Sequence, residues 1–428
     1  MSENKKFPRR TLGAILMLSF SGELAWAVEN QYFNTFIYNM IAPVPLYVSL
    51  LVSITAVVST LTTIFMGALS DKKGKRGPFL KIGMIFFILT TALFPFSAEI
   101  GDIFSSVILA VFMAILFDSI MSFFGATAND AALNAYVTDV TTLENRGKIS
   151  SIKEVMFFVA LLVVYGLSGQ IIEAFNYYIY FFIIAALAAV FGIPGAFLAH
   201  ESDNLKPNRK KYWTIIKDAF NPKTLIENRD LSFVLFSVGL WGIGFFSFFP
   251  FILIYVQWYL SIDINTASII VFIAFLISII LAYPTGKIVD KVGRKKVAII
   301  FVIVETIFLL LFAMAREFIF LVITVSVWIY AFLGFNISTR TWLKDLYPED
   351  RRGQFHGYYL VFNILIGMVI GSLVGGFIAE TFGTYFITGT ALGELPGYIP
   401  PPLLFIVSAI IIITAIIPLI WAKEVKQK

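Results

Sequence analysis

Twelve long apolar stretches separated by short polar connections dominate this 428-residue sequence. A helix needs about 20 mostly apolar residues to cross the hydrocarbon core of a bilayer. Because backbone polar groups in lipid must be satisfied internally, helices are the expected spanning structure. The stretches cover residues 11–38, 43–69, 79–97, 104–137, 153–173, 178–199, 231–258, 266–285, 298–314, 318–340, 354–383 and 402–422.

The composition favours the same fold class. The chain is 59% hydrophobic and 14% charged, with a mean hydropathy of +0.86, whereas a soluble domain carries about 25% charged residues. Cysteine is absent, which excludes disulfides and cysteine-ligated zinc. We therefore predict an all-α membrane protein with lipid as its solvent, no metal site and no cofactor.

The basic residues fall on alternate connections. Every one of the 32 Lys and Arg residues except Arg316 lies on the connections that share a side with both termini. Basic loops are retained on the cytoplasmic side, so both termini are predicted to be cytoplasmic, in the cytoplasmic membrane. Topology thus explains the net charge of +5, and nucleic-acid binding is not expected.

Two motifs occur twice. G-x-x-x-D-K-x-G-[KR]-[KR] begins at Gly67 and again at Gly286, and D-x6-R-G begins at Asp139 and again at Asp345. The long polar segment 200–230 lies between the copies, and internal repeats are a common transporter plan. We predict an N-terminal six-helix bundle (1–199), a cytoplasmic linker (200–230) and a C-terminal six-helix bundle (231–428).

These paired motifs among twelve spans resemble the major facilitator superfamily. The resemblance implies two six-helix bundles around a central cavity and transport by alternating access. The proline-ended turn at 70–78 is similar to that of glycoside–cation symporters and sucrose carriers, and Trp26-Ala27-Val28-Glu29 resembles the sucrose carriers' W-A-L-Q. Unlike the sodium-coupled members, the second stretch has no acid between Pro43 and Gly67, so a proton is expected rather than sodium.

Acidic residues inside the stretches are candidates for proton coupling. A charge at mid-bilayer costs at least about 2.5–3.5 kcal/mol, and no Lys or Arg is predicted there as a partner. Because burial disfavours the ionised form of a carboxyl group, a proton is its natural partner. The candidates are Glu23, Glu29, Asp118 and Asp130, whereas Glu305 is predicted to be structural.

The first stretch also carries candidate substrate contacts. Glu23, Trp26 and Asn30 are spaced i, i+3 and i+7, so they share one helical face. An acid, an aromatic plate and an amide suit a polyhydroxylated ligand. Trp26 and Asn30 are therefore predicted to contact the substrate.

The second repeat relates further residues across the two halves. Its offset maps Asp130 onto Asn336 and Asn134 onto Arg340. An acid of one half and a base of the other are thus expected to meet across the cavity floor. Asn134, Asn336 and Arg340 are predicted substrate contacts, although Arg340 fits equally well as a snorkelling residue at the end of its helix.

The repeated motifs are also predicted to form a gate. A carboxylate at Asp71 or Asp290 can accept hydrogen bonds from a neighbouring helix N-terminus. Such bonds would form in one conformation and break in the other. The basic residues alone would satisfy the topology rule, without these acids. The predicted gate residues are Asp71, Arg76, Asp290, Arg294, Arg146 and Arg352.

Taken together, the sequence predicts a monomeric, proton-coupled secondary transporter that takes up a small molecule, a sugar or glycoside, by symport. A proton antiporter that exports hydrophobic or cationic compounds stays open, because an acid-rich, aromatic cavity suits it equally. A non-transporting receptor on the same fold is a third hypothesis. The sequence contains no nucleotide-binding motif and no nucleophile–base arrangement, so neither an ATP-driven pump nor an enzyme is expected.

Overall fold

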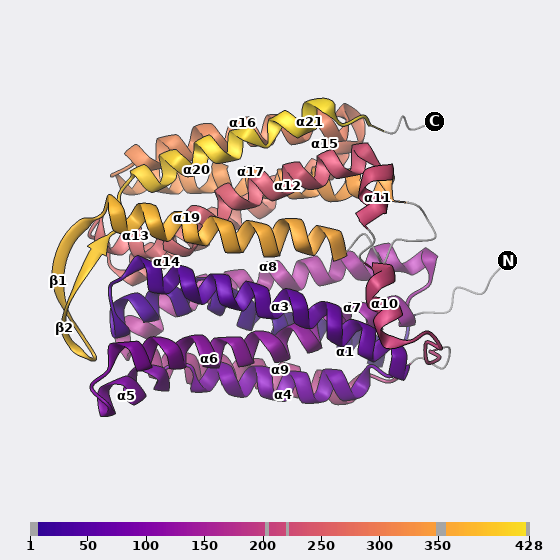
Figure 1. Ribbon diagram of the computed structural model, residues 1–428, viewed down its shortest axis with the longest axis horizontal. Coiled ribbons are helices and arrows are strands. Elements are labelled where there is room, and N and C mark those ends of the chain that lie inside the picture. The colour runs from indigo at the N-terminus through magenta and orange to yellow at the C-terminus, as the bar shows by residue number, and fades with distance from the viewer. Residues whose placement is uncertain (1–6, 202–204, 220–221, 348–356, 425–428) are drawn as a thin grey trace.

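The computed structural model describes residues 7–201, 205–219, 222–347 and 357–424, and most of them are helical (Figure 1). Within this described part, 11 helices are long and apolar enough to cross a membrane, and a pair bent by 50° makes a twelfth. The predicted all-α membrane fold is confirmed. Both termini lie at one end of the molecule, here called the terminal end, and a β-hairpin lies at the opposite, hairpin end.

The first six spans pack mainly against one another. Helix α1 contacts α8 and α9, α4 contacts α6 and α9, and α3 contacts α6. The elements are α1 (Arg9–Val28), η1 (Glu29–Phe33), α2 (Asn34–Phe36), η2 (Ile37–Ile41), α3 (Pro45–Lys73), α4 (Gly77–Leu93), α5 (Phe96–Ile103), α6 (Val107–Gly125), η3 (Ala126–Leu133), α7 (Asn134–Val140), α8 (Leu143–Ala174) and α9 (Tyr177–Leu198).

The last six spans form the other bundle. Helix α12 contacts α19 and α20, and α16 contacts α17 and α20. After the short helices α10 (Tyr212–Ala219) and α11 (Pro222–Glu227) come α12 (Arg229–Phe248), η4 (Phe249–Phe251), α13 (Ile252–Trp258), α14 (Ile264–Ala282), α15 (Thr285–Val292), α16 (Arg294–Met314), α17 (Phe318–Leu346), η6 (Leu360–Ile366), α19 (Gly367–Thr381), α20 (Leu403–Thr414) and α21 (Ile416–Trp421).

Among the described residues, three spans contain π-helical turns, which were not predicted from the sequence. They are η1 and η2 in the first span, η3 in the fourth and η6 in the eleventh. A π turn inserts an extra residue into a helix and frequently marks a functional site. Here η1 begins at Glu29, η3 carries Asp130 and η6 carries Asn363. The irregular turns therefore coincide with polar residues of the spans.

The two bundles meet where α8 packs on α14 and along a seam between α3 and α19. Ser49 Oγ donates to the carbonyl oxygen of Ser372 at 2.5 Å, and the hydroxyls of Ser53 and Ser372 are hydrogen-bonded at 2.8 Å. A Cβ atom at Gly376 would lie 2.0 Å from Ser49 Oγ. Only glycine allows the helices to approach this closely, and close approach with hydroxyl bonding is how spans associate in lipid.

A β-hairpin follows α19 and was not predicted. Strands β1 (Thr384–Thr390) and β2 (Gly393–Ile399) pair antiparallel, with Thr384 opposite Ile399. Gly393 adopts a φ of 101° at the turn, a conformation that glycine tolerates best. The run of β-branched and aromatic residues at the start of β1, followed by turn residues, is the signal that would have revealed the hairpin.

The hairpin belongs to the C-terminal bundle but is bonded to the first span. The backbone N–H of Ala391 donates to Met40 O, and that of Tyr398 donates to Pro43 O, each at 3.0 Å. The hydroxyl of Tyr38 donates to Tyr398 O at 2.6 Å. Because these bonds join the two bundles at the hairpin end, they hold that end closed.

We predict that replacing residues 385–398 by a short Gly-Ser linker will weaken this closure. The three bonds above each contribute about 0.5–1.5 kcal/mol, so the population opened at the hairpin end should rise. The chain has no cysteine, so two introduced cysteines at Phe175 and Ser261 can carry spin labels. Distances between the labels should broaden to longer values; an unchanged distribution would show that the hairpin does not hold the bundles together.

Candidate functional site

Arg76 is the centre of a charged cluster at the terminal end. Its Nε donates to Asp139 Oδ2 at 2.9 Å, its Nη2 pairs with Asp71 Oδ1 at 2.7 Å, and its Nη1 donates to Ser70 Oγ at 2.7 Å. The Arg76 side chain is only 5% exposed. One guanidinium thus joins the turn after α3 to the end of α7.

Burial and charge act in opposite directions on Arg76. Burial alone would lower the pKa of its guanidinium, but the hydrogen bonds and charges of Asp139 and Asp71 outweigh burial and raise that pKa above its usual value. The group therefore stays protonated. A buried cation of this kind holds its acidic partners in place, because losing one of them would leave the charge unpaired.

Glu201 completes this cluster. Its carboxylate accepts hydrogen bonds from the backbone N–H groups of Arg76 at 2.9 Å and Gly77 at 2.8 Å, at the start of α4. An anion at a helix N-terminus is stabilised by unpaired N–H groups and by the helix dipole. The end of α9 is thereby tied to the beginning of α4.

The C-terminal bundle repeats the arrangement. Arg294 Nε donates to Asp345 Oδ2 at 3.0 Å, and Nη2 pairs with Asp290 Oδ1 at 3.2 Å. The backbone N–H of Lys295 donates to Glu424 at 2.6 Å. Glu424 therefore accepts a hydrogen bond at the start of α16, as Glu201 does at the start of α4.

The two arginines do not occupy the same position in the repeated motif. In the sequence motif, Arg76 aligns with Lys295. In the structure, however, it is Arg294 that pairs with Asp345, as Arg76 pairs with Asp139. The first turn is longer: Gly74 is left-handed with φ 59°, and α4 begins three residues later, at Gly77. In the second turn α16 begins directly after Gly293. Because the second turn is shorter, the arginine one position earlier in the motif reaches the aspartate of the D-x6-R-G repeat.

The gate prediction is changed in one respect. Among the described residues, the carboxylates that accept from helix N-termini here are Glu201 and Glu424, while Asp71 and Asp290 pair with the arginine of their own turn. Arg352 lies outside the described residues, as does the side chain of Arg146. A gating role for the predicted residues stays a prediction.

Glu201 and Glu424 were not predicted as part of these clusters, although the sequence contains a signal for them. Each follows the last span of its bundle in an Ala-x-Glu triplet, at Ala199 and at Ala422. This is a third repeat, in addition to the two motifs that were recognised. It was overlooked because a single acid after a span looks like an ordinary solvated loop residue.

In the first span, Glu23, Trp26 and Asn30 are all partly exposed. The Asn30 side-chain amide donates to Trp26 O at 2.7 Å, within its own helix. The Trp26 ring lies against Phe87 of α4, with centroids 5.1 Å apart. The predicted face is thus partly exposed, but the side-chain nitrogen of Asn30 is already bonded to the backbone.

Glu29 and Asp118 form a pair of carboxyl groups between the first and fourth spans. The two side chains interact electrostatically, and Ser122 Oγ donates to Glu29 Oε1 at 3.1 Å. Asp118 is only 1% exposed. Neither Asp118 oxygen accepts a hydrogen bond from a described residue, and a buried carboxylate without a donor is costly. Binding a proton removes that cost.

The expectation that the buried acids lack a basic partner is wrong. Lys153 of α8 interacts electrostatically with Glu23 and Asp130, and its Nζ donates to Asn134 Oδ1 at 2.5 Å. The reason lies at the beginning of the helix. A capping box formed by Thr142 and Asn145 starts α8 at residue 143, ten residues before the predicted apolar stretch, and carries Lys153 into the span.

On the opposite side, Arg340 belongs to a network of the C-terminal bundle. Its Nε donates to the Tyr359 hydroxyl at 3.1 Å, which lies 3.2 Å from Asn336 Oδ1. Asn363 Nδ2 donates to the same hydroxyl at 3.2 Å. Arg340 also faces the N-terminal bundle, where its Nη1 is 3.9 Å from Glu154 Oε1. An acid and a base do meet across the two bundles, but the acid at this distance is Glu154 and not Asp130.

These residues form what we term the central polar cluster, which spans both bundles. Arg340 and Glu154 are half exposed, with side-chain values of 50% and 59%, so solvent reaches the cluster. Its members are Glu23, Asp130, Asn134, Lys153, Glu154, Asn336, Arg340, Tyr359 and Asn363.

Glu305 lies apart from the cluster. It is fully buried in the C-terminal bundle, where Trp241 Nε1 donates to its Oε2 at 2.8 Å. Trp241 itself is 1% exposed and stacks on Phe245 and Phe335. This position agrees with the structural role predicted for Glu305.

Comparisons with known proteins point in one direction. A family model described as the Major Facilitator Superfamily matches residues 30–260 and 234–428. The solved nucleoside transporter NupG is similar, with a TM-score of 0.71 at 17% identity over 98% of this chain and 100% of that chain. The xylose transporter XylE from E. coli, in a partially occluded inward-open conformation, has a TM-score of 0.67 at 15% identity over 95% and 97%. No curated protein matches this chain. At these identities the structural likeness shows the fold alone.

We predict that Asp139→Asn will destabilise the protein by about 2 kcal/mol or more, because it leaves the buried Arg76 charge short of a partner. Asp71→Asn is the matched control: its side chain is 46% exposed, so its loss should cost less than about 1 kcal/mol. Thermal unfolding of each variant in detergent measures the difference. Equal effects of the two substitutions would contradict the assigned role of Asp139.

Proposed function

Because the chain belongs to the major facilitator superfamily, it is a multi-pass membrane transporter of a small molecule and not an enzyme, and we propose that it is a proton-coupled symporter of a neutral sugar or glycoside. It works as a monomer in the cytoplasmic membrane, with both termini in the cytoplasm. The basic connections at the terminal end support that orientation.

The carboxyl pair of Glu29 and Asp118 carries the proposal of proton coupling. We infer that the pair holds at least one proton, because Asp118 is buried, neither of its oxygens has a hydrogen-bond donor among the described residues, and the acid Glu29 is its neighbour. Removing that proton would place two negative charges side by side, so its release is coupled to a rearrangement of the first and fourth spans. Glu29 belongs to the same span as the predicted substrate contacts Trp26 and Asn30, so a movement of that span affects both.

The residues of the central polar cluster suit a neutral, hydroxylated solute. The amides of Asn336 and Asn363 and the hydroxyl of Tyr359 offer both donors and acceptors, and sugar hydroxyls require both. Trp26 adds an aromatic plate on the opposite bundle. The fold neighbours are described as nucleoside and xylose transporters, so nucleosides and pentoses belong in any substrate panel.

The alternative, a proton antiporter that exports cations, is less well supported. From the sequence alone, both functions suit an acid-rich cavity equally, because no basic partner of the acids is predicted. Lys153 and Arg340 now lie among those acids, and their positive charges oppose the binding of a cation. The cluster therefore carries both signs and does not form a purely acidic trap.

We further propose that this conformation opens toward the cytoplasm. Hydrogen bonds between the bundles gather on the hairpin side, among them Tyr38 to Tyr398 and Ser49 to Ser372. Solvent reaches Arg340 and Glu154, and the strands cover the hairpin end. Alternating access would then require the seam and the hairpin contacts to break.

The test of this function is proton movement in proteoliposomes that enclose a pH-sensitive dye. Sugars, glycosides and nucleosides, together with lipophilic cations, are added outside. We expect a neutral solute to acidify the lumen in the wild type and at least a tenfold slower response in Glu29→Gln. Exchange of labelled solute without a gradient should persist in that variant, because the solute contacts are intact.

Glu305→Gln is the matched control, since it removes a buried acid outside the central polar cluster but leaves an oxygen for Trp241 to bond; its coupling should be unchanged. Equal loss in both variants would contradict the assignment of the carboxyl pair. Proton movement with cations only would make the protein an exporter. No solute movement under any gradient would favour the receptor hypothesis.

A second prediction separates the two transport modes through Glu23. In a sugar symporter, Glu23→Gln should keep exchange of the solute and reduce its accumulation, because the substitution removes charge but preserves hydrogen bonding. In a cation exporter the same change should abolish discrimination between charged and neutral compounds. Accumulation and exchange of the same labelled solute, measured side by side, distinguish these outcomes.

A further inference from the structure

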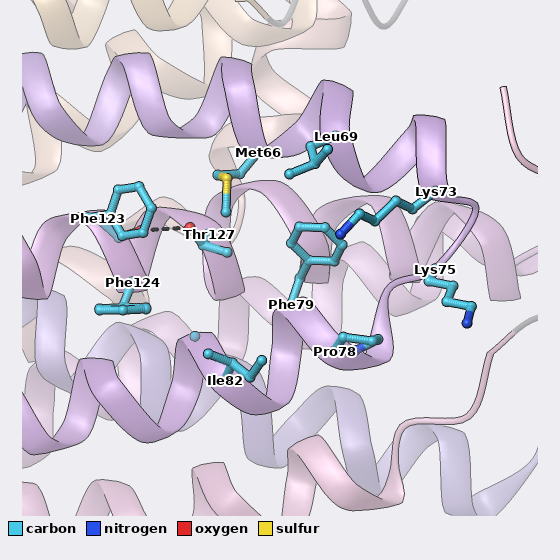
Figure 2. A pocket seen from close by; sticks show the side chains of 11 residues that line it. Met66, Leu69, Lys73, Lys75, Pro78, Phe79, Ile82, Phe123, Phe124 and Thr127 are labelled. Carbon is cyan, nitrogen blue, oxygen red and sulfur yellow. Dashed lines mark hydrogen bonds between the residues drawn. The ribbon is translucent and has the colours of Figure 1, made fainter. Parts of the chain in front are cut away.

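A pocket opens on the side of the N-terminal bundle, away from the central polar cluster, with a volume of about 390 Å³ (Figure 2). Its walls come from α3, α4 and α6 and are almost wholly apolar. Met66 and Leu69 lie on one side, Phe79 and Ile82 on another, and Phe123 and Phe124 on the third.

The pocket faces the lipid. Ile82 is 55% exposed and Phe123 is 37% exposed, as expected for side chains directed toward acyl chains. Its inner end is closed where α4 meets η3, since a Cβ atom at Gly83 would lie 2.8 Å from that of Ala128. From Pro78 to Gly83 the wall runs about 7 Å along α4, so the pocket reaches from the basic turn into the outer part of the hydrocarbon.

Two lysines stand at the mouth of this apolar pocket. Lys73 and Lys75 both line it and are exposed, and Lys73 Nζ lies 5.8 Å from the centroid of the Phe79 ring. Within the described part of the chain, neither forms an ion pair, whereas the neighbouring Arg76 has two. Their charges can therefore interact with an anionic group at the mouth of the pocket.

We propose that this pocket binds an anionic phospholipid. One acyl chain lies along Met66, Phe79 and Phe123, and the phosphate is held between the ammonium groups of Lys73 and Lys75. The apolar walls select a lipid over a soluble anion, because a free phosphate gains nothing from them. The two lysines, which form no ion pair among the described residues, favour an anionic headgroup over a zwitterionic one. Each basic residue near a membrane surface strengthens the binding of an anionic lipid about fivefold.

The test uses the full-length protein, stripped of lipid in a neutral detergent and titrated with phosphatidylglycerol or phosphatidylcholine. Native mass spectrometry counts the lipid molecules that stay bound. We expect the wild type to retain phosphatidylglycerol at least tenfold more tightly than phosphatidylcholine. The double variant Lys73→Gln/Lys75→Gln should lose about 30-fold in affinity for phosphatidylglycerol and bind both lipids alike.

The matched control removes the same charge from the repeated turn of the other bundle. Lys287→Gln/Lys291→Gln should leave phosphatidylglycerol binding within twofold of the wild type. A third variant, Met66→Trp, narrows the pocket and should weaken both lipids, which a purely electrostatic attraction would not show. Because both lysines are exposed, thermal unfolding without lipid should be unchanged in the double variant.

Three results would overturn the proposal. Equal retention of the two lipids by the wild type would indicate unspecific coating by lipid. Equal loss in the lysine variant and its matched control would reduce the effect to general charge. Displacement of the bound lipid by glycerol phosphate at the same concentration would make the site one for a soluble anion.

Discussion

The cost of an unpaired charge near lipid governs where the charged groups of this protein lie. A guanidinium offers a planar fork of donors that can satisfy two carboxylates at once. Arg76 and Arg294 use this property at the end of each bundle where the spans leave the hydrocarbon. Lysine, with a compact ammonium group, could not bridge the same partners. The arginines therefore fix the connection between two spans against the end of a third.

The two bundles share this anchor but differ in their interiors. The N-terminal bundle contributes carboxyl groups, including Glu29 and Asp118, whereas the C-terminal bundle contributes amides, a tyrosine and Arg340. In the proposed function, protons bind mainly to one bundle and the solute contacts both. A movement between the bundles then changes the surroundings of solute and proton together, which is the physical requirement for coupling them.

The spans could be predicted because the length of an apolar stretch and the side of its basic flanks are strong local signals. The arginine clusters could be predicted in part, since the repeats match Asp71 with Asp290 and Asp139 with Asp345. Contacts between helices could not. Glu29 and Asp118 are far apart in the sequence, and their pairing depends on how two helices dock and on the π turn that begins at Glu29.

Polar helix starts were the other source of error. The first turns of α8 are polar, so a search for apolar stretches does not include them. Lys153 was therefore predicted at the end of a loop, although it lies inside the helix. The β-hairpin was missed because a search for spans ends where hydropathy falls, and a strand as short as β1 needs a shorter window than a span does. Both errors concern residues that join the bundles or face the gap between them, where local sequence carries the least information.

The bonds that close the hairpin end are of a kind that a carrier can break. Those at the seam and hairpin join neutral hydroxyl and backbone groups, as in Ser49 to Ser372 and Tyr38 to Tyr398, and a neutral bond contributes about 0.5–1.5 kcal/mol net. A handful of them therefore amounts to a few kcal/mol, which is within the range that binding one solute and one proton can supply. Buried ion pairs at the same place would have cost more to separate. By contrast, the Arg76 and Arg294 clusters lie within a bundle, so they can stay intact while the bundles move against each other.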